Sequence, residues 1–222
     1  MKRITLLSAF CALVLLSSCS RLMHWTYHTF HEPDYIKVDL MPVRYRFLRT
    51  IRAYDQLNTV ALFDVLWLSY EVIDAYSILY ALRRGQDKAY EASIRECRLD
   101  ELERDSFSFI VLIAQEDGLA FGNLHGKWGV ALEIENRTYC PKKVSIIDDF
   151  EYEYKAIFGD FYNRFKTPYL VQFDAYDEYG SPVMPNSSDL VSLLFTTVDY
   201  REYCTFALEG PPEGPGHHQH TY

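Results

Sequence analysis

The chain has 222 residues and a formal net charge of −9; 49% of its residues are hydrophobic and 16% are aromatic. This length and apolar content suffice for one folded domain with a buried core, which excludes a wholly disordered chain. The acidic balance excludes the basic face that nucleic-acid backbones require, so no nucleic acid is expected as a partner.

The first nineteen residues have the pattern of a secretory signal peptide. Lys2 and Arg3 precede an apolar stretch from Ile4 to Leu16, which is too short to span a bilayer as a helix. The stretch ends in the letters LSSC at Cys19, which resemble the lipobox of bacterial lipoproteins. That resemblance implies that residues 1–18 are removed and that Cys19 is lipidated. Because Ser20 rather than an aspartate follows, it also implies the outer membrane. The alternative is an ordinary signal peptide or membrane anchor with a chance cysteine.

Residues 19–43 are expected to form a lipidated tether between the anchor and the folded body. Two prolines interrupt this segment, and three histidines lie among its aromatic side chains. On a helix these histidines could present nitrogens to a metal ion, but no carboxylate or cysteine completes the pattern. A tether that lies along the membrane interface is the simpler interpretation, and no metal centre is predicted.

Residues 44–106 are expected to form a helical subdomain. Residues 57–68 are apolar on nearly every side, which predicts a buried helix. Ser69 is a suitable N-cap for a second helix, whose apolar residues recur every three or four positions until Gly85 ends it. A third helix is predicted from about residue 87 to residue 104.

Residues 107–209 are expected to form an antiparallel β-sandwich. After Ser106 the hydrophobic pattern changes to alternation, and short strands follow with turn signals but no helical pattern between them. Residues 210–222 are rich in proline and glycine and are expected to be a disordered tail. The predicted strands lie near residues 107–113, 128–134, 144–146, 169–173, 190–195 and 203–208.

Several phrases of the sequence together resemble a group of bacterial envelope lipoproteins with a helical front and an immunoglobulin-like back. In chain order they are AYDQLNTVALFDVLWLSYEV, AYSILYALRRG, FSFIVLIAQED, WGVALEI and EYKAIFGDFYNRFKTPYLVQF. The resemblance covers about residues 50–208. It implies an α+β fold in which an N-terminal helical subdomain packs on a C-terminal antiparallel, immunoglobulin-like β-sandwich. It implies nothing about chemistry, because the group has no assigned activity.

Motifs of known catalytic sites are missing from the sequence, which contains no GxSxG, HExxH, P-loop, GxGxxG or CxxC. His125 is the one histidine of the expected folded body, and a cysteine–histidine dyad is the alternative to a surface loop histidine. Asp64 lies in an apolar run and is expected to pair with an arginine or to face a groove. The acidic run at residues 148–153 lacks the glycine of a calcium loop, so a solvated strand edge is expected. No catalytic residue and no cofactor is predicted.

Three cysteines lie in the expected folded body. An exported compartment permits disulfides, and the odd number leaves at least one thiol unpaired. Cys140 and Cys204 both lie in the β-rich half and are the expected disulfide pair. Three buried, unreactive thiols, with Cys97 as the third, are the alternative.

Arginines and aromatic residues are the candidates for partner contacts. Four arginines within nine residues could clamp an anionic lipid head group or sugar phosphate, unless they pair with acids of the same chain. The aromatic residues between positions 152 and 165 are too many for one core face, so some are expected on a partner-binding surface. The candidates are Arg44, Arg46, Arg49, Arg52, Tyr152, Tyr154, Phe161 and Tyr162.

The sequence thus predicts a lipid-anchored protein of the bacterial envelope that acts as a non-enzymatic binding or assembly module. Its partners would be the membrane, through the N-terminal lipid, and another envelope protein. The alternative is a small-ligand or glycan-binding protein, or an enzyme, with a site between the helical and β parts. A polar pocket at that junction, with a carboxylate and a histidine within hydrogen-bond reach, would favour the alternative. A continuous apolar junction would favour the binding module.

Overall fold

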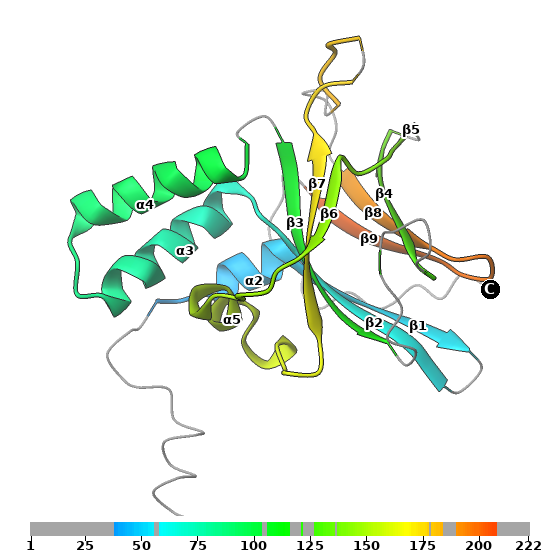
Figure 1. Cartoon of the computed structure of the whole chain (residues 1–222), viewed down its shortest axis with the longest axis horizontal. Helices are drawn as coiled ribbons and strands as arrows, with labels where there is room; N and C mark the ends of the chain where they lie inside the picture. The colour runs from blue at the N-terminus through cyan, green and yellow to red at the C-terminus, as the bar shows by residue number, and fades with distance from the viewer. Residues whose placement is uncertain are drawn as a thin grey trace, which may run out of the picture. The chain divides into compact units, whose positions relative to one another are not determined.

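The computed structural model describes residues 38–55, 58–103, 106–115, 121, 127–135, 137–177, 179–183 and 190–207 (Figure 1). By its internal contacts the chain divides into the units Met1–Lys37 and Val38–Tyr222, and all described residues belong to the second unit. The expected signal peptide, Cys19, the tether histidines, His125 and the tail lie outside the described residues.

The strands of the described body are antiparallel and form two sheets. The five-stranded sheet has the order β1-β2-β3-β7-β6, and the four-stranded sheet has the order β5-β4-β8-β9. The strands are β1 (Leu48–Asp55), β2 (Asn58–Trp67), β3 (Ser106–Gln115), β4 (Gly129–Ile134), β5 (Arg137–Tyr139), β6 (Lys143–Ile146), β7 (Thr167–Asp174), β8 (Leu190–Thr196) and β9 (Arg201–Ala207). The helices are α2 (Met41–Phe47), α3 (Tyr70–Arg83), α4 (Lys88–Glu101), α5 (Tyr152–Phe158) and the 3-10 helix η1 (Gly159–Phe161).

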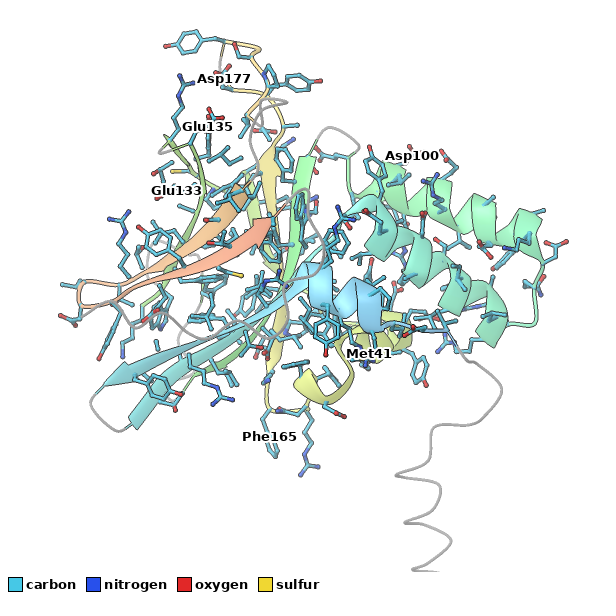
Figure 2. The ribbon with its side chains drawn as sticks, turned by 180° about the vertical axis from the view of Figure 1, so that it is seen from behind. Met41, Asp100, Glu133, Glu135, Phe165 and Asp177 are labelled. Atoms are coloured by element: carbon cyan, nitrogen blue, oxygen red, sulfur yellow. The ribbon has the colours of Figure 1, made fainter. Side chains whose placement is uncertain are left out.

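The core between the two sheets is filled with aromatic rings. Phe63 of β2 stacks on Phe195 of β8 with 4.5 Å between the ring centroids. Trp67 of β2 meets Phe206 of β9 edge-on at 5.8 Å. Helices α3, α4 and α5 lie on the side of the five-stranded sheet that faces away from the four-stranded sheet (Figures 1 and 2). The central strands β2 and β3 of the five-stranded sheet are therefore covered on both faces, whereas its edge strands β1 and β6 have exposed side chains.

The prediction of a buried helix over residues 57–68 is wrong. Residues 58–67 form β2, which pairs with β1 on one side and with β3 on the other. A strand that is covered on both faces has a nearly continuous apolar sequence, and periodicity alone does not distinguish it from a buried helix. Because β1 precedes it, two strands lie within the segment 44–106 that was expected to be helical.

The second and third predicted helices are confirmed. Helix α3 begins after Ser69, whose Oγ accepts a hydrogen bond from the backbone N–H of Val72 at 3.4 Å. Gly85 follows its end with a φ of +62°, a conformation in which glycine avoids the penalty of a Cβ atom. Helix α4 begins after Asp87, whose carboxylate accepts from the N–H of Tyr90 at 3.0 Å. None of the described helices is long and apolar enough to cross a bilayer.

Two short helices lie where none was predicted. Helix α2 begins at Met41, inside the segment expected to be tether, and its last residue, Phe47, is buried. Helix α5 lies in the segment where only strands were expected. Each has seven residues, about two turns, which is too short for a helical period to stand out in the sequence.

The fold is α+β, with helices and antiparallel strands in one body. The six strands predicted after residue 106 are confirmed as β3, β4, β6, β7, β8 and β9. The finer expectation of an immunoglobulin-like back is not confirmed.

Candidate functional site

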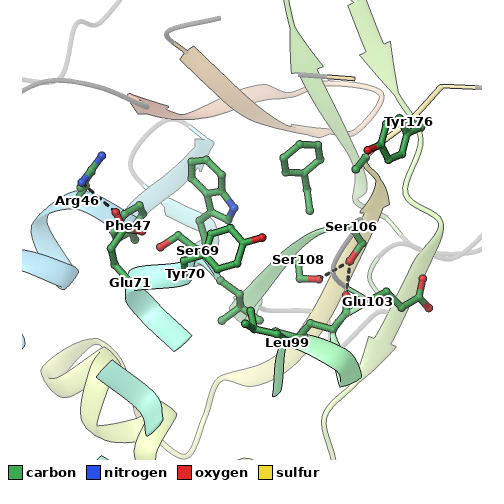
Figure 3. Close-up of a pocket in the computed structure, with 15 residues that line it drawn as sticks. Arg46, Phe47, Ser69, Tyr70, Glu71, Leu99, Glu103, Ser106, Ser108 and Tyr176 are labelled. Carbon is green, nitrogen blue, oxygen red and sulfur yellow. Dashed lines mark hydrogen bonds and ion pairs between the residues drawn. The ribbon is translucent and has the colours of Figure 1, made fainter. Parts of the chain in front are cut away.

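A pocket with a volume of about 470 Å³ opens where the helices meet the five-stranded sheet (Figure 3). Strand β2 ends at Trp67 opposite Phe109, so the first residues of β3 extend beyond the end of β2 and border the pocket. The end of α2, the start of α3, the end of α4 and the segment after β7 complete the wall. The lining residues are Arg46, Phe47, Trp67, Leu68, Ser69, Tyr70, Glu71, Leu99, Leu102, Glu103, Ser106, Phe107, Ser108, Ala175 and Tyr176.

Aromatic rings form much of the pocket wall. Trp67 is 8% exposed and packs edge-on against Phe47, with 6.0 Å between the ring centroids. Tyr70 and Tyr176 are 60% and 52% exposed, which places them at the rim. Rigid apolar walls with a few polar groups among them are typical of sites for small molecules.

Two carboxylates line the pocket, and a cation holds each of them. Arg46 donates to Glu71 at 3.2 Å, and Lys142 donates to Glu103 at 2.7 Å. Hydrogen bonds to Glu103 and Asp174 raise the pKa of Lys142. In Figure 3 the Arg46–Glu71 pair and Glu103 lie at opposite ends of the pocket. The two lining carboxylates are therefore compensated by ion pairs.

Two serines of β3 form a polar corner that the protein satisfies internally. The hydroxyl of Ser106 donates to the carbonyl oxygen of Leu102 and lies 3.2 Å from the hydroxyl of Ser108. The amide of Gln172 donates to Ser108 Oγ and to the Leu102 carbonyl, each at 3.2 Å. These bonds fix the end of α4 against β3 and β7, and they hold that part of the pocket wall in place.

The polar side chains of the pocket wall are carboxylates, hydroxyls and one guanidinium group. The lining residues include no histidine and no cysteine, the usual partners of a nucleophilic or general-base mechanism. Within the part of the chain that the structure describes, no group of three or more histidine, cysteine or acidic side chains could hold a metal ion. The junction therefore has the expected pocket and carboxylates. The histidine required by the enzyme alternative, His125, lies outside the described residues.

Asp64 is buried and paired, although its partner is a lysine rather than an arginine. Lys166 donates to one carboxylate oxygen of Asp64 and to the carbonyl of Phe161, the latter at 2.7 Å. Thr50 donates to the other carboxylate oxygen at 2.6 Å. Both members of the ion pair are buried, so Asp64 joins the centre of β2 to the residue that precedes β7 and does not line the pocket.

The four candidate arginines do not form one anion clamp. Arg44 donates to two carbonyl oxygens at the end of α5, at 2.6 and 2.7 Å. Arg49 donates to two carbonyl oxygens of its own segment, at 2.6 and 3.0 Å. Arg46 alone of the four lines the pocket, while Arg52 is exposed on β1. The guanidinium groups of Arg44 and Arg49 are therefore held by backbone carbonyl oxygens, whereas acidic side chains were the expected partners.

The four candidate aromatic residues divide between the surface and the interior. Tyr152 and Phe161 are exposed, and Tyr162 is half-buried. Tyr154 is buried against Tyr76 of α3, with 4.6 Å between the ring centroids, and burial raises the pKa of its phenol. The expectation that Tyr154 belongs to a partner surface is therefore wrong.

Only the first half of the acidic run is solvated as expected: Asp148 and Asp149 are exposed after the edge strand β6. Its last acids lie at the start of α5, where negative charge suits the helix dipole. Glu151 forms an ion pair with Arg98 of α4. Glu153 is buried and forms ion pairs with Arg83 at 3.1 Å and Arg84 at 3.2 Å, at the end of α3. These acids join the three helices to one another.

Cys140 and Cys204 are free thiols, so the expected disulfide is not formed in the structure. Three strand pairings separate the two cysteines. Tyr139, the neighbour of Cys140, pairs with Leu132 of β4. Leu132 pairs with Leu193 of β8, and Leu193 pairs with Cys204 of β9. Since neighbouring strands lie about 4.8 Å apart, three such steps separate Cys204 from the neighbour of Cys140 by roughly 14 Å. A disulfide spans about 7 Å at most between Cα atoms.

No protein-family model matches the chain, and a search of the curated proteins finds no match either. The resemblance to envelope lipoproteins therefore stays a prediction. What can be said of function rests on the N-terminal sequence and on the pocket.

Sequence reasoning missed nearly all of the pocket and singled out only Arg46 among its residues. The lining comes from segments that are far apart in the chain, and it assembles only once β2 is placed beside β3. One signal was present. Trp67 and Tyr70 lie on either side of the N-cap Ser69, and a helix start beside aromatic rings offers N–H donors together with an apolar contact.

Proposed function

We propose that the protein is a lipid-anchored binding protein of the bacterial cell envelope that takes a small ligand into its junction pocket without catalysing a reaction on it. Cys19 would carry the lipid and hold the protein at the outer membrane. The two sheets would form a sandwich that supports the pocket. The observation that carries this proposal is the pocket itself, about 470 Å³ in volume with aromatic walls and ion-paired carboxylates.

The pocket supports binding of a small molecule for two physical reasons. Its volume lies in the range of ligand sites, about 300–1,000 Å³. Its polar corner and its ion pairs fix the wall before a ligand arrives, which lowers the entropic cost of binding. The alternative that the sequence left open, a ligand site at the junction, is thereby favoured over a module that binds only proteins.

The anchor is tested by expressing the protein in a bacterial host with a palmitate analogue that can be tagged. The wild-type protein should carry the label and sediment with membranes, and Cys19→Ala should lose both properties. Cys11→Ala is the matched control, since Cys11 lies in the segment expected to be removed, and it should keep the label. Labelling that persists in Cys19→Ala would refute the lipid anchor.

The pocket is tested by protein-observed NMR with a chemically diverse set of small molecules. Binding should shift signals of pocket residues, and Ala175→Trp should abolish those shifts by filling the cavity. Ala207→Trp, at the exposed end of β9, is the matched control and should leave them unchanged. If no compound shifts pocket signals in the wild-type protein, ligand binding at the junction is refuted.

A second candidate function, docking of an envelope protein, is favoured by exposed aromatic residues around α5. Tyr152 and Phe161 are 49% and 43% exposed. Phe165 projects from the loop before β7, at the end of the strand remote from Asp177 (Figure 2). In-cell crosslinking should then capture one dominant envelope protein. That capture should be lost in Tyr152→Ser/Phe161→Ser, and an unchanged crosslinking profile would count against docking at this surface.

A further inference from the structure

Several acceptors of the pocket are already engaged. Glu71 pairs with Arg46, Glu103 pairs with Lys142, and the two serines of β3 bond to their neighbours. Donors without a partner among the described residues lie around the start of α3, beside the Arg46–Glu71 pair and away from Glu103 (Figure 3). A ligand that uses these donors must supply acceptor oxygens.

Trp67 provides the buried donor. Its side chain is 8% exposed, and its indole N–H makes no hydrogen bond to the described residues. No side-chain nitrogen or oxygen of the described residues is both fully enclosed and without a partner, so the indole nitrogen must retain some access to solvent. Trp67 lines the pocket, and we infer that this access is to the pocket. Water in the pocket can reach this N–H, and an acceptor on a ligand would take the place of that water.

The first turn of α3 adds further donors beside Trp67. The backbone N–H groups of Tyr70 and Glu71 make no hydrogen bond to described residues, because Ser69 caps the N–H of Val72 instead. Both residues line the pocket. The start of a 14-residue helix also carries a partial positive charge, which favours an anion. The charge of Glu71 opposes such an anion, but Arg46 compensates it.

We propose that the pocket binds a small monocarboxylic acid with an apolar or aromatic body, its carboxylate on the indole N–H of Trp67 and the first N–H groups of α3. The body would lie against Phe47 and Phe107, with the exposed rings of Tyr70 and Tyr176 at the mouth. This inference rests on the proposed function, because it names the ligand class of the same pocket.

The test compares three compounds with the same ring: phenylacetate, phenylacetamide and 2-phenylethylamine. Calorimetry should give the tightest binding for phenylacetate, by about tenfold or more over the amide, because a hydrogen bond to a charged acceptor contributes about 1.5–3 kcal/mol. Trp67→Phe should weaken phenylacetate binding by about tenfold or more and remove most of its advantage over the amide. Trp128→Phe, which alters a buried tryptophan outside the pocket, is the matched control and should leave the affinity unchanged.

A second measurement needs no variant. In a nitrogen–proton NMR spectrum the indole N–H signal of Trp67 should move downfield as phenylacetate is added, while that of Trp128 stays in place. Glucose is added as a neutral polyhydroxyl probe. If 2-phenylethylamine or glucose shifts pocket signals and phenylacetate does not, the pocket binds a ligand class other than acids. That result overturns this inference but leaves the proposed function standing. If none of these probes and none of the wider set shifts pocket signals, both fall.

Discussion

The buried ion pair of Asp64 and Lys166 allows a sharp test of how the sheet is held together. Asp64→Asn leaves the ammonium of Lys166, which is 8% exposed, without a counter-charge inside the protein. Removing one member of a buried pair costs about 3–5 kcal/mol. At about 2–4 °C per kcal/mol for a chain of this size, the melting temperature should fall by roughly 6–20 °C. Urea denaturation followed by tryptophan fluorescence measures the change in the free energy of unfolding.

Two controls separate the charge from the other contacts. Thr50→Val removes only the hydroxyl that donates to Asp64 at 2.6 Å and should cost about 1 kcal/mol. Asp64→Leu/Lys166→Met replaces both charges with apolar groups and should recover most of the stability that either single change loses. The reasoning is refuted if Asp64→Asn costs less than about 1 kcal/mol, or if the double variant loses the sum of the two single losses.

Two further outcomes are expected, one for a glycine and one for the thiols. Gly159→Ala should destabilise the protein by about 2 kcal/mol or more, since a left-handed φ of +57° is strained and the new Cβ would lie 2.7 Å from the guanidinium that caps α5. Gly85→Ala, at a φ of +62° with no atom within 4 Å, should cost only about 1 kcal/mol; equal urea midpoints for the two variants would argue against the cap. With a thiol reagent at about pH 8, Cys140 should react faster than Cys97, because a hydrogen bond to a glutamate raises the pKa of Cys97 and the thiolate is the reactive form. Burial raises the pKa of Cys204, so it should react only after unfolding, and mass spectrometry of labelled peptides at successive times checks this order.

The elements that the sequence predicted correctly are those with a local physical signal. Ser69 and Gly85 mark the two ends of α3 by their side-chain and backbone chemistry, and the structure has both in these roles. Alternation revealed the strands after residue 106. Strand β2 lacked such a signal, because layers on both faces of its sheet remove the polar positions. In β1 the signal was present, since residues 51–54 alternate between buried and exposed, but the arginines of that segment were interpreted as a charged stripe.

The pocket was beyond the reach of sequence reasoning for a different reason. Trp67 lines the pocket because it is the last residue of β2. Phe107 lines it because β3 extends beyond Phe109, the residue that pairs with Trp67. Such offsets follow from strand register, which depends on pairing between distant segments. The sequence did predict that the junction of helices and sheet was the place to search, and the pocket lies there.

Helix α4 contributes no fully buried side chain to the protein. It is held by half-buried contacts with α3 and by ion pairs such as that of Arg98 with Glu151. A segment attached in this way opens at a free energy well below that of global unfolding. Its amide protons should therefore exchange with solvent sooner than those of β2 and β3. Because Leu99 and Leu102 near its end line the pocket, each such opening also removes part of the wall, so a ligand could leave without the sheets separating.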